Sequence, residues 1–408
     1  MREMKKKKAK KWVKLRHKII TTIASLLIIP MSKIKYRVKV ERFKESKRKD
    51  RKYLVLFNHQ TAYDQFFVAM AFYGPVYYVA SEDLFSMGFL SKLLKYAVAP
   101  IPIKKQTTDI TAVMNCMRVA KEGGTIALAP EGNRTFSGKT CYFKPAIVKL
   151  VKAIKLPIAI FRIEDGYGVH PRWADDVRKG GMKAYVKEVI EPEDYLKLSD
   201  EELYEILKDK LYVDESSPNK EFHHKKLAEG MERAIYYCPD CGLSKFSSKG
   251  DKITCEKCGK VVRYTPDKQL IGVDFDFKYK NIAEWYDAQC SYMNSIDLSK
   301  YNETVILDEK IKFSEVVLYQ NKKLIEKNAQ VRLYGNKIIV KLKTEERVFL
   351  FDELDAVTVL GKNKINLYYQ KRVYQISNNK SLNALLFVNI FNRYQNIKGG
   401  DGDDFLGL

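Results

Sequence analysis

Four cysteines near the middle of the chain restrict its fold more than any other feature. Cys238 and Cys241 form one C-x-x-C pair, Cys255 and Cys258 form a second, and thirteen residues separate the pairs. A glycine follows each pair, which lets each short turn aim both thiolates at one point. The spacing predicts a zinc ribbon at residues 236–265 with one structural Zn ion, while rubredoxin-like iron and an empty or redox-active site are the alternatives.

This arrangement of cysteines has two consequences. Four thiolates leave no open coordination position, so we expect the metal to support the scaffold or a partner contact rather than catalysis. The chain has seven cysteines in all, and an odd number favours a reducing compartment over a framework of disulfides.

The pattern of the 408 residues changes on either side of the cysteines. Residues 53–235 alternate strand-like and helix-like segments, which predicts an α/β domain with a mixed sheet flanked by helices. Residues 275–395 show several strand-like segments, turn signals and one final apolar helix, a β-rich pattern that resembles pleckstrin-homology-like or GRAM-like domains. Residues 396–408 follow as a Gly- and Asp-rich tail.

The segments expected in the α/β domain follow from apolar runs and their boundaries. Strands are expected at residues 53–57, 75–81, 97–103, 125–130, 157–163 and, as an edge strand, 182–190. Helices are expected at residues 64–73, 107–123, 143–155, 198–212 and 219–235. Ser199 and Glu202 have the spacing of a capping box, so they mark the start of the fourth helix.

Positive charge is concentrated at the N-terminus. Residues 1–52 contain 21 Lys or Arg and 4 Asp or Glu, and so carry +17 of the net charge of +23. Within them, residues 19–32 are uncharged and would form a helix of about 21 Å, shorter than a hydrocarbon core of about 30 Å. We expect this segment to lie in the interface of an anionic membrane, as a peripheral or monotopic contact on the cytoplasmic face of the cell membrane.

Two other interpretations of this segment stay open, a tilted or hairpin membrane insertion and a basic tail that binds nucleic acid. An enzyme that acts on nucleic acids more often spreads its charge over a folded face, whereas residues 53–408 supply only +6. We therefore expect no nucleic-acid partner.

A histidine and an aspartate flank the first expected turn of the α/β domain. His59 follows the strand at residues 53–57, and Asp64 opens the next helix. The turn can bring the carboxylate against the imidazole, so that one ring nitrogen is protonated and the other acts as a general base toward an alcohol. The alternative is a loop histidine beside an aspartate that merely favours a helix N-terminus.

Residues 130–135 read Pro-Glu-Gly-Asn-Arg-Thr and follow an expected buried strand. The guanidinium of Arg134 suits bidentate binding of a phosphate, and Gly132 would let the backbone approach an anion closely. The alternative is a polar turn in which Arg134 is solvated.

Together, these two stretches resemble the 1-acylglycerol-3-phosphate acyltransferases and the related glycerolipid acyltransferases that share an H-x4-D motif. The first motif of that family, NHxxxxD, matches Asn58, His59 and Asp64. The third, PEG-[TN]-R-[ST], matches residues 130–135.

The other two family motifs match less closely. The second motif normally ends an apolar strand with an arginine, and here Lys104 or Lys105 stands in its place, which keeps the charge but loses the planar fork. The fourth motif, a strand around a proline, resembles residues 155–161. The likeness extends over roughly a third of the chain.

The resemblance implies an O-acyltransferase. His59, oriented by Asp64, would deprotonate the free hydroxyl of a lysophosphatidate-type acceptor, 1-acylglycerol-3-phosphate. The resulting alkoxide would attack the thioester of acyl-CoA or acyl carrier protein in one step and give phosphatidic acid for phospholipid synthesis.

The remaining motif residues are expected to bind substrate, and backbone N–H groups near the glycine to stabilise the oxyanion. These residues are Asn58, Lys104, Glu131, Gly132, Asn133, Arg134 and Thr135. Two alternatives stay open. One is an acyltransferase of the same fold that uses another lysophospholipid or membrane alcohol, and the other is a non-catalytic, lipid-binding adaptor with a zinc ribbon.

Overall fold

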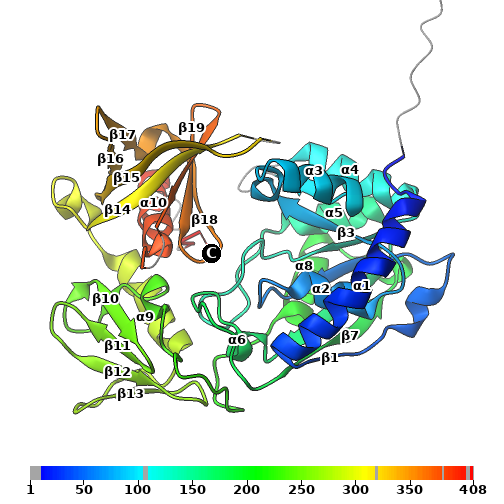
Figure 1. Ribbon diagram of the computed structural model, residues 1–408, viewed down its shortest axis with the longest axis horizontal. Helices are drawn as coiled ribbons and strands as arrows, with labels where there is room; N and C mark the ends of the chain where they lie inside the picture. The colour runs from blue at the N-terminus through cyan, green and yellow to red at the C-terminus, as the bar shows by residue number, and fades with distance from the viewer. Residues whose placement is uncertain (1–10, 104–108, 318–319, 379–380, 401–404, 408) are drawn as a thin grey trace, which may run out of the picture.

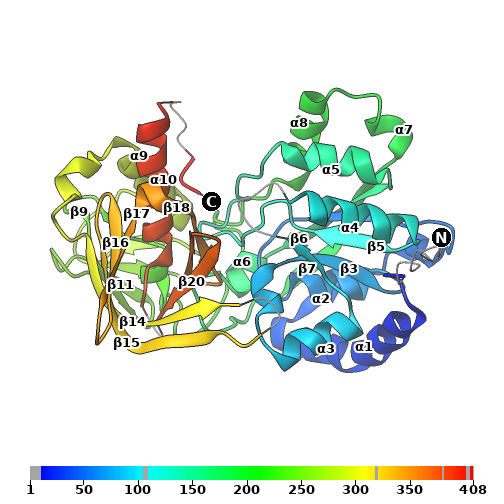
Figure 2. The same cartoon turned by 90° about the horizontal axis from the view of Figure 1, so that it is seen from above.

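The computed structural model describes residues 11–103, 109–317, 320–378, 381–400 and 405–407. The α/β domain, here residues 37–235, lies beside a small cysteine module (residues 236–272) and a C-terminal β domain (residues 281–400), as Figure 1 shows. Figure 2 shows the same division from above, with the final helix α10 (Ala384–Gly399) standing among the strands of the C-terminal β domain.

The α/β domain is built on one seven-stranded sheet in the order β1-β7-β6-β2-β5-β3-β4. Its strands are β1 (Val38–Val40), β2 (Leu54–Phe57), β3 (Val76–Ser81), β4 (Ile101–Ile103), β5 (Thr125–Leu128), β6 (Ile158–Glu164) and β7 (Met182–Ile190). Strands β6 and β7 are antiparallel and the other neighbouring pairs are parallel, so the expected mixed sheet is confirmed. The prediction of an edge strand at 182–190 is wrong, because β1 pairs with β7 on its outer side.

Helices cover both faces of this sheet. They are α1 (Leu15–Tyr36), α2 (Asp64–Ala71), α3 (Phe89–Ala97), α4 (Ile110–Lys121), α5 (Ala146–Ile154), α6 (Gly166–Val169), α7 (Pro192–Tyr195) and α8 (Asp200–Leu211). Val55 and Phe57 of β2 pack with α1 and α2 on one face, whereas Leu54 and Leu56 pack with α4, α5 and α8 on the other. This alternation follows from the two-residue period of a strand.

Two expectations for helix boundaries have opposite outcomes. The capping box at Ser199 and Glu202 is confirmed at the start of α8. The helix expected at 219–235 is wrong, since only Met231–Arg233 form a short 3-10 turn there. This segment instead bonds to distant backbone, as in Phe222 N–H to Pro266 O and Ala228 N–H to Gly250 O, and its buried side chains override its helix propensity.

The cysteine module consists of two small antiparallel sheets. Its strands are β8 (Tyr237–Cys238), β9 (Gly242–Leu243), β10 (Phe246–Lys249), β11 (Lys252–Cys255), β12 (Val261–Tyr264) and β13 (Leu270–Gly272). The last strand extends the module beyond the residue 265 expected from the sequence.

The C-terminal β domain has a second seven-stranded sheet, antiparallel throughout, in the order β17-β16-β15-β14-β20-β19-β18. Its elements are α9 (Ile282–Ser295), β14 (Leu307–Val316), β15 (Lys323–Leu333), β16 (Lys337–Lys341), β17 (Glu346–Leu350), β18 (Leu354–Leu360), β19 (Lys364–Tyr369), β20 (Arg372–Ser377) and α10 (Ala384–Gly399). The expected β-rich domain with a final helix is confirmed, and α9 is an addition to it.

Short 3-10 helices complete the description. They are η1 (Lys44–Lys47), η2 (Glu82–Phe85), η3 (Met231–Arg233), η4 (Leu298–Tyr301) and η5 (Phe351–Glu353).

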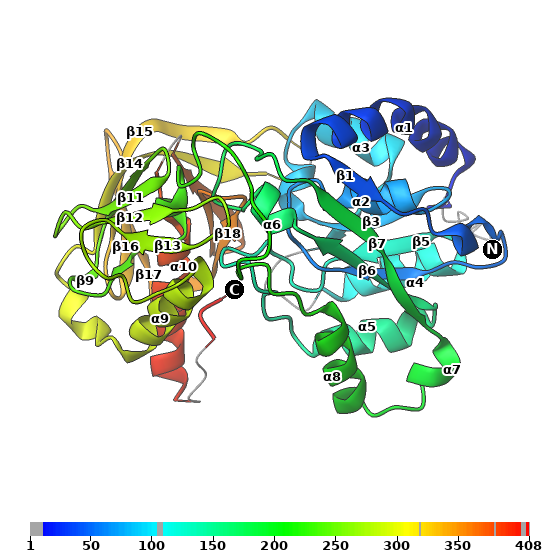
Figure 3. The same ribbon diagram turned by 90° about the horizontal axis from the view of Figure 1, so that it is seen from below.

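One hydrophobic core runs through all three parts of the chain. It joins Phe136, Tyr167 and Trp173 of the α/β domain to the cysteine module and to the C-terminal β domain. Helix α9 links the cysteine module to the C-terminal β domain, because Trp285 Nε1 donates to Tyr237 O at 2.8 Å. On the same helix, the Gln289 side chain accepts the Tyr236 N–H and donates to Ala234 O. The parts therefore pack as one body (Figure 3).

Helix α1 lies along the outside of the α/β domain, next to α2 and α3 (Figure 1). The helix has 22 residues and so extends beyond the uncharged stretch at residues 19–32. By length and composition alone, it is long and apolar enough to cross a membrane. Both ends are attached to the domain. His17 Nδ1 lies 3.1 Å from Tyr77 Oη, and the buried Tyr36 packs on Tyr63 and Phe67.

Candidate active site

His59 and Asp64 meet at the carboxyl end of β2. The turn after β2 carries the histidine, and the aspartate is the first residue of α2. His59 Nδ1 lies 2.8 Å from Asp64 Oδ2. The pair expected from the sequence is therefore brought together, with Asp64 fully buried and His59 about a quarter exposed.

The Asp64 carboxylate is fixed by the turn that it closes. It accepts the Gln60 N–H at 2.7 Å, the Thr61 N–H at 2.9 Å and the Thr61 hydroxyl at 2.7 Å. A carboxylate held in this way accepts the proton of His59 Nδ1, which leaves a lone pair on Nε2. The histidine is thereby set up as a base.

The surroundings of His59 favour its neutral form. Burial lowers the pKa of His59, the charges of Arg134 and Arg172 lower it further, and Asp64 acts in the opposite direction. The net shift is downward from the ordinary value of 6.5. Neutral imidazole is the form that can accept a proton from an alcohol.

Asn58 joins the turn of His59 and Asp64 to the neighbouring strand. Its side-chain amide donates to Ile163 O at 2.9 Å and accepts the Ile163 N–H at 2.8 Å. Both bonds are buried and hold the end of β2 against β6. Substrate binding by Asn58 stays a prediction, and these contacts give it a positioning role in the free protein.

Glu131 ties the two motif stretches together. Its Oε1 accepts the His59 N–H and its Oε2 accepts the Cys141 N–H, both at 2.7 Å. Burial raises the pKa of Glu131 to about 8, although both backbone bonds act in the opposite direction. These two bonds set the position of the His59 backbone, and no local sequence signal indicates them. Substrate binding by Glu131 stays a prediction.

The loop at residues 130–135 turns at Gly132, whose φ is +62°. That conformation favours glycine. The Gly132 N–H donates to Ala129 O at 3.0 Å, so this group closes the turn. Thr135 also supports the loop, since its N–H donates to His59 O at 3.3 Å and its hydroxyl accepts the Gly138 N–H at 2.9 Å.

Arg134 is half-buried close to the His59–Asp64 pair. Burial lowers the pKa of Arg134, whereas Asp64 and Tyr36 raise it. Among the described residues, its guanidinium has no hydrogen-bond partner, so its donors are directed to no protein group there. Asn133, also half-buried, precedes it, and Lys104 lies outside the described residues.

Two further residues adjoin the site and carry no recognisable sequence motif. His170 Nδ1 lies 3.4 Å from Tyr36 Oη. Burial and the nearby charges of Arg134, Lys362 and Lys35 lower the pKa of His170 to about 3, so it is neutral. Tyr36 is the last residue of α1 and packs on Tyr63, which places the end of that helix beside the turn of His59 and Asp64.

The four predicted cysteines also meet. The Sγ atoms of Cys238, Cys241, Cys255 and Cys258 all lie within 4.8 Å of one another, and Cys238 Sγ is 3.8 Å from Cys258 Sγ. A tetrahedral Zn ion with Zn–S bonds of about 2.3 Å separates its sulfurs by about 3.8 Å. The glycines after each pair have φ of +68° and +73°, as the knuckle turns require. The donor set therefore fits a closed metal site.

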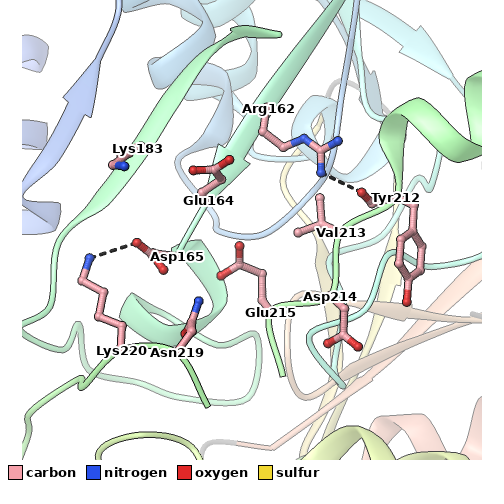
Figure 4. Close-up of a pocket in the computed structure, with 10 residues that line it drawn as sticks. All are labelled: Arg162, Glu164, Asp165, Lys183, Tyr212, Val213, Asp214, Glu215, Asn219 and Lys220. Atoms are coloured by element: carbon pink, nitrogen blue, oxygen red, sulfur yellow. Dashed lines mark hydrogen bonds and ion pairs between the residues drawn. The ribbon is translucent and has the colours of Figure 1, made fainter. Parts of the chain in front are cut away.

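A separate cavity of about 520 Å³ lies beside the end of β6 (Figure 4). It is lined by Arg162, Glu164, Asp165, Lys183, Tyr212, Val213, Asp214, Glu215, Asn219 and Lys220. None of the motif residues lines it. This cavity is therefore distinct from the space in front of His59.

Comparison with known proteins bears on the site directly. Residues 37–163 match the family model of the acyltransferases. This part of the chain is an acyltransferase domain. The match includes both the H-x4-D turn and the loop at 130–135, so it confirms the expected likeness to acyltransferases for this part of the chain.

Solved structures similar to parts of the chain include one enzyme and two small domains. The 1-acyl-sn-glycerophosphate (LPA) acyltransferase PlsC from Thermotoga maritima has 21% identity and a TM-score of 0.39, covering 48% of this chain and 76% of that chain. The Vps36 N-terminal PH domain has 17% identity and a TM-score of 0.20, covering 24% of this chain and 82% of that one. The N-terminal PH domain of human ARAP2 has 13% identity and a TM-score of 0.18, covering 22% and 81%. No curated protein matches the chain at a significant level.

Proposed function

We propose that the protein transfers a fatty acyl group from acyl-CoA or acyl carrier protein to the free hydroxyl of 1-acylglycerol-3-phosphate. The product would be phosphatidic acid for phospholipid synthesis. The observation that carries the proposal is the 2.8 Å contact between His59 Nδ1 and the buried carboxylate of Asp64, within an acyltransferase domain.

The chain's own groups suffice for the proton transfers of this reaction. His59 Nε2 takes the proton of the acceptor hydroxyl, and the oxygen bonds to the thioester carbonyl carbon. When the carbon–sulfur bond breaks, the departing thiolate takes that proton back from the imidazolium. Asp64 stabilises the imidazolium while it exists and keeps the ring in the correct tautomer.

Acceptor recognition follows from charge. Arg134 offers donors that no described group occupies, next to the base, and a guanidinium binds phosphate through two parallel hydrogen bonds. A phosphate held there would leave a glycerol hydroxyl within reach of His59. Asn133 and Lys104 are further candidates for this contact.

Membrane association is proposed for the face formed by α1 and α3. The two helices touch, since Arg16 Nε donates to Tyr96 O at 3.1 Å. Their exposed apolar residues are Leu15, Ile19, Ile23, Leu26, Leu27, Met31, Ile34, Phe89, Leu90, Leu93 and Tyr96. Such a face, rimmed by Lys and Arg, suits a peripheral or monotopic contact with an anionic, cytoplasmic leaflet.

We further propose that the four cysteines hold a structural Zn ion. All four ligands would come from the chain, so the metal would supply stability to the cysteine module and no chemistry to the acyl transfer. Because the module shares a core with both neighbours, the ion would stabilise the packing of the whole chain.

The proposal is tested by incubating the purified protein with labelled acyl-CoA, or acyl carrier protein, and separate acceptors. Lysophosphatidate should be acylated faster than lysophosphatidylglycerol or lysophosphatidylethanolamine. Cys290→Ser, on α9, serves as the control variant and His59→Ala as the inactive one. Equal transfer by His59→Ala and the parent protein would contradict the proposal, and preference for another lysolipid would reassign the acceptor.

A further inference from the structure

Arg172 connects the acyltransferase loop to the C-terminal β domain. Its side chain is buried, with its guanidinium 4.3 Å from the centre of the Phe136 ring. Arg172 Nη1 donates to Arg134 O at 2.7 Å, and its Nε donates to Gly361 O at 2.6 Å. Gly361 begins the turn between β18 and β19, so one guanidinium holds that turn and the loop of Arg134 together.

The next residue of the turn is anchored on the same side. Lys362 forms an ion pair with Asp175, which also pairs with Arg233 Nη2 at 2.9 Å. Lys362 is partly buried, whereas Asp175 is more than half exposed. In Figure 3, β18 lies beside α6 of the α/β domain, in agreement with the bond from Arg172 to Gly361.

Three positive charges therefore gather beside the site. Burial and the charge of Arg134 lower the pKa of Lys362, and the same two causes lower the pKa of Arg172 to about 9. Arg134 and Lys362 both lower the pKa of His170 as well. Like charges that lie close together in a partly buried site repel each other, and a bound anion relieves that repulsion.

We propose that the β18–β19 turn completes the acceptor-phosphate subsite of the acyltransferase domain, with Lys362 as a second cation beside Arg134. The inference rests on the proposed function and extends it to a residue outside the acyltransferase domain. Arg172 is the positioning residue that sets the distance between the two cations. The C-terminal β domain is then part of the active site rather than a separate module.

The test compares Lys362→Met with Lys364→Met, an exposed lysine of β19 two residues away. Lys362→Met should raise KM for lysophosphatidate about tenfold, the effect of one charge-assisted phosphate contact. KM for acyl-CoA, KM for a monoacylglycerol without phosphate, and kcat should stay within about twofold. Lys362→Arg should restore most of the loss, and Lys364→Met should match the parent protein.

Asp175→Asn separates phosphate binding from a merely structural ion pair. If Lys362 binds phosphate, Asp175→Asn leaves KM for lysophosphatidate unchanged or lower, since it frees the lysine. If the ion pair only holds the turn, Asp175→Asn raises that KM as Lys362→Met does, and the inference is overturned. Equal KM values for Lys362→Met and Lys364→Met would overturn it as well.

A binding measurement keeps the inference separable from the proposed function. Glycerol 3-phosphate should raise the Tm of the parent protein and of Lys364→Met, and raise that of Lys362→Met much less. Equal increases in Tm for Lys362→Met and Lys364→Met would overturn the inference even if lysophosphatidate is acylated. A parent protein that acylates only neutral alcohols contradicts the proposed function, whatever the variants do.

Discussion

His59 and Asp64 are five residues apart in the chain, and their Nδ1 and Oδ2 atoms are 2.8 Å apart in the folded protein. The aspartate reaches back over the turn because it opens α2, and it bonds to the backbone of the same turn. The strand end, the turn and the helix start thus form one rigid unit around the base.

This unit predicts a large effect of Asp64→Asn on catalysis. An amide in place of the carboxylate disfavours the tautomer with a proton on Nδ1 and leaves the imidazolium unstabilised, so kcat should fall about 10³- to 10⁴-fold. Steady-state acyl transfer measures it. Asp109→Asn is the matched control, because Asp109 caps α4 by accepting the Ala112 N–H and asparagine caps equally well. Equal kcat values for the two variants would exclude the assigned role.

The pH profile should show an acid limb below the ordinary histidine value. The pKa of His59 is lowered mainly by burial, and the base must be neutral, so kcat/KM should rise with pH through a pKa below 6.5 and level off near neutrality. Arg134→Leu removes one of the charges that lower the pKa of His59, so its acid limb should move to higher pH. A parent profile with its inflection above 6.5 would be inconsistent with this environment.

Removing a ligand from the cysteine cluster should cost stability. Metal analysis of the purified protein should find one Zn per chain, and Cys258→Ser should lose it and lower the Tm. Cys290→Ser, outside the cluster, should keep the metal. Full Zn occupancy in Cys258→Ser would show that the ion binds elsewhere.

Asn58→Ala should destabilise the domain more than it weakens substrate binding. It leaves the buried N–H and C=O of Ile163 without side-chain partners, which costs about 2 kcal/mol of the free energy of unfolding. Thermal and denaturant unfolding measure this, with the exposed Asn328→Ala as the control. An unchanged Tm together with a raised KM would instead support direct substrate binding.

The apolar face of α1 should govern membrane binding. Leu26→Glu with Leu27→Glu puts two charges on side chains that are 72% and 75% exposed, so binding to anionic vesicles should fall at least tenfold. Co-sedimentation measures it, and kcat in detergent micelles should be nearly unchanged. Val348→Glu on β17, 45% exposed, should bind like the parent; loss of binding there would point to another membrane face.

The sequence predicted those parts of the site that depend on short-range chemistry. His59 and Asp64 needed only a strand end followed by a helix start, and the four cysteines needed only their spacing. Ser199 and Glu202 likewise form a cap within one turn. Each of these arrangements is complete within about twenty residues, so distant packing does not decide it.

Long-range packing decided the rest. Glu131 bonds to a backbone N–H 72 residues away in the sequence, and Arg172 to a carbonyl 189 residues away. Local sequence patterns do not predict contacts between residues so far apart in the chain. The segment 219–235 has good helix formers, yet Phe222 is fully buried and its N–H bonds to Pro266 O. Tertiary contacts outweighed a local preference of a few tenths of a kcal/mol per residue there.

The core shared by the three parts limits how the gene can be shortened. A polypeptide that stops at residue 235 would lack most of the core that Phe136, Tyr167 and Trp173 share, including Tyr264, which packs on Trp173. Large apolar surfaces left open in this way promote aggregation. Expression of the catalytic half alone should therefore give inclusion bodies, and a soluble form would need those side chains replaced by polar ones.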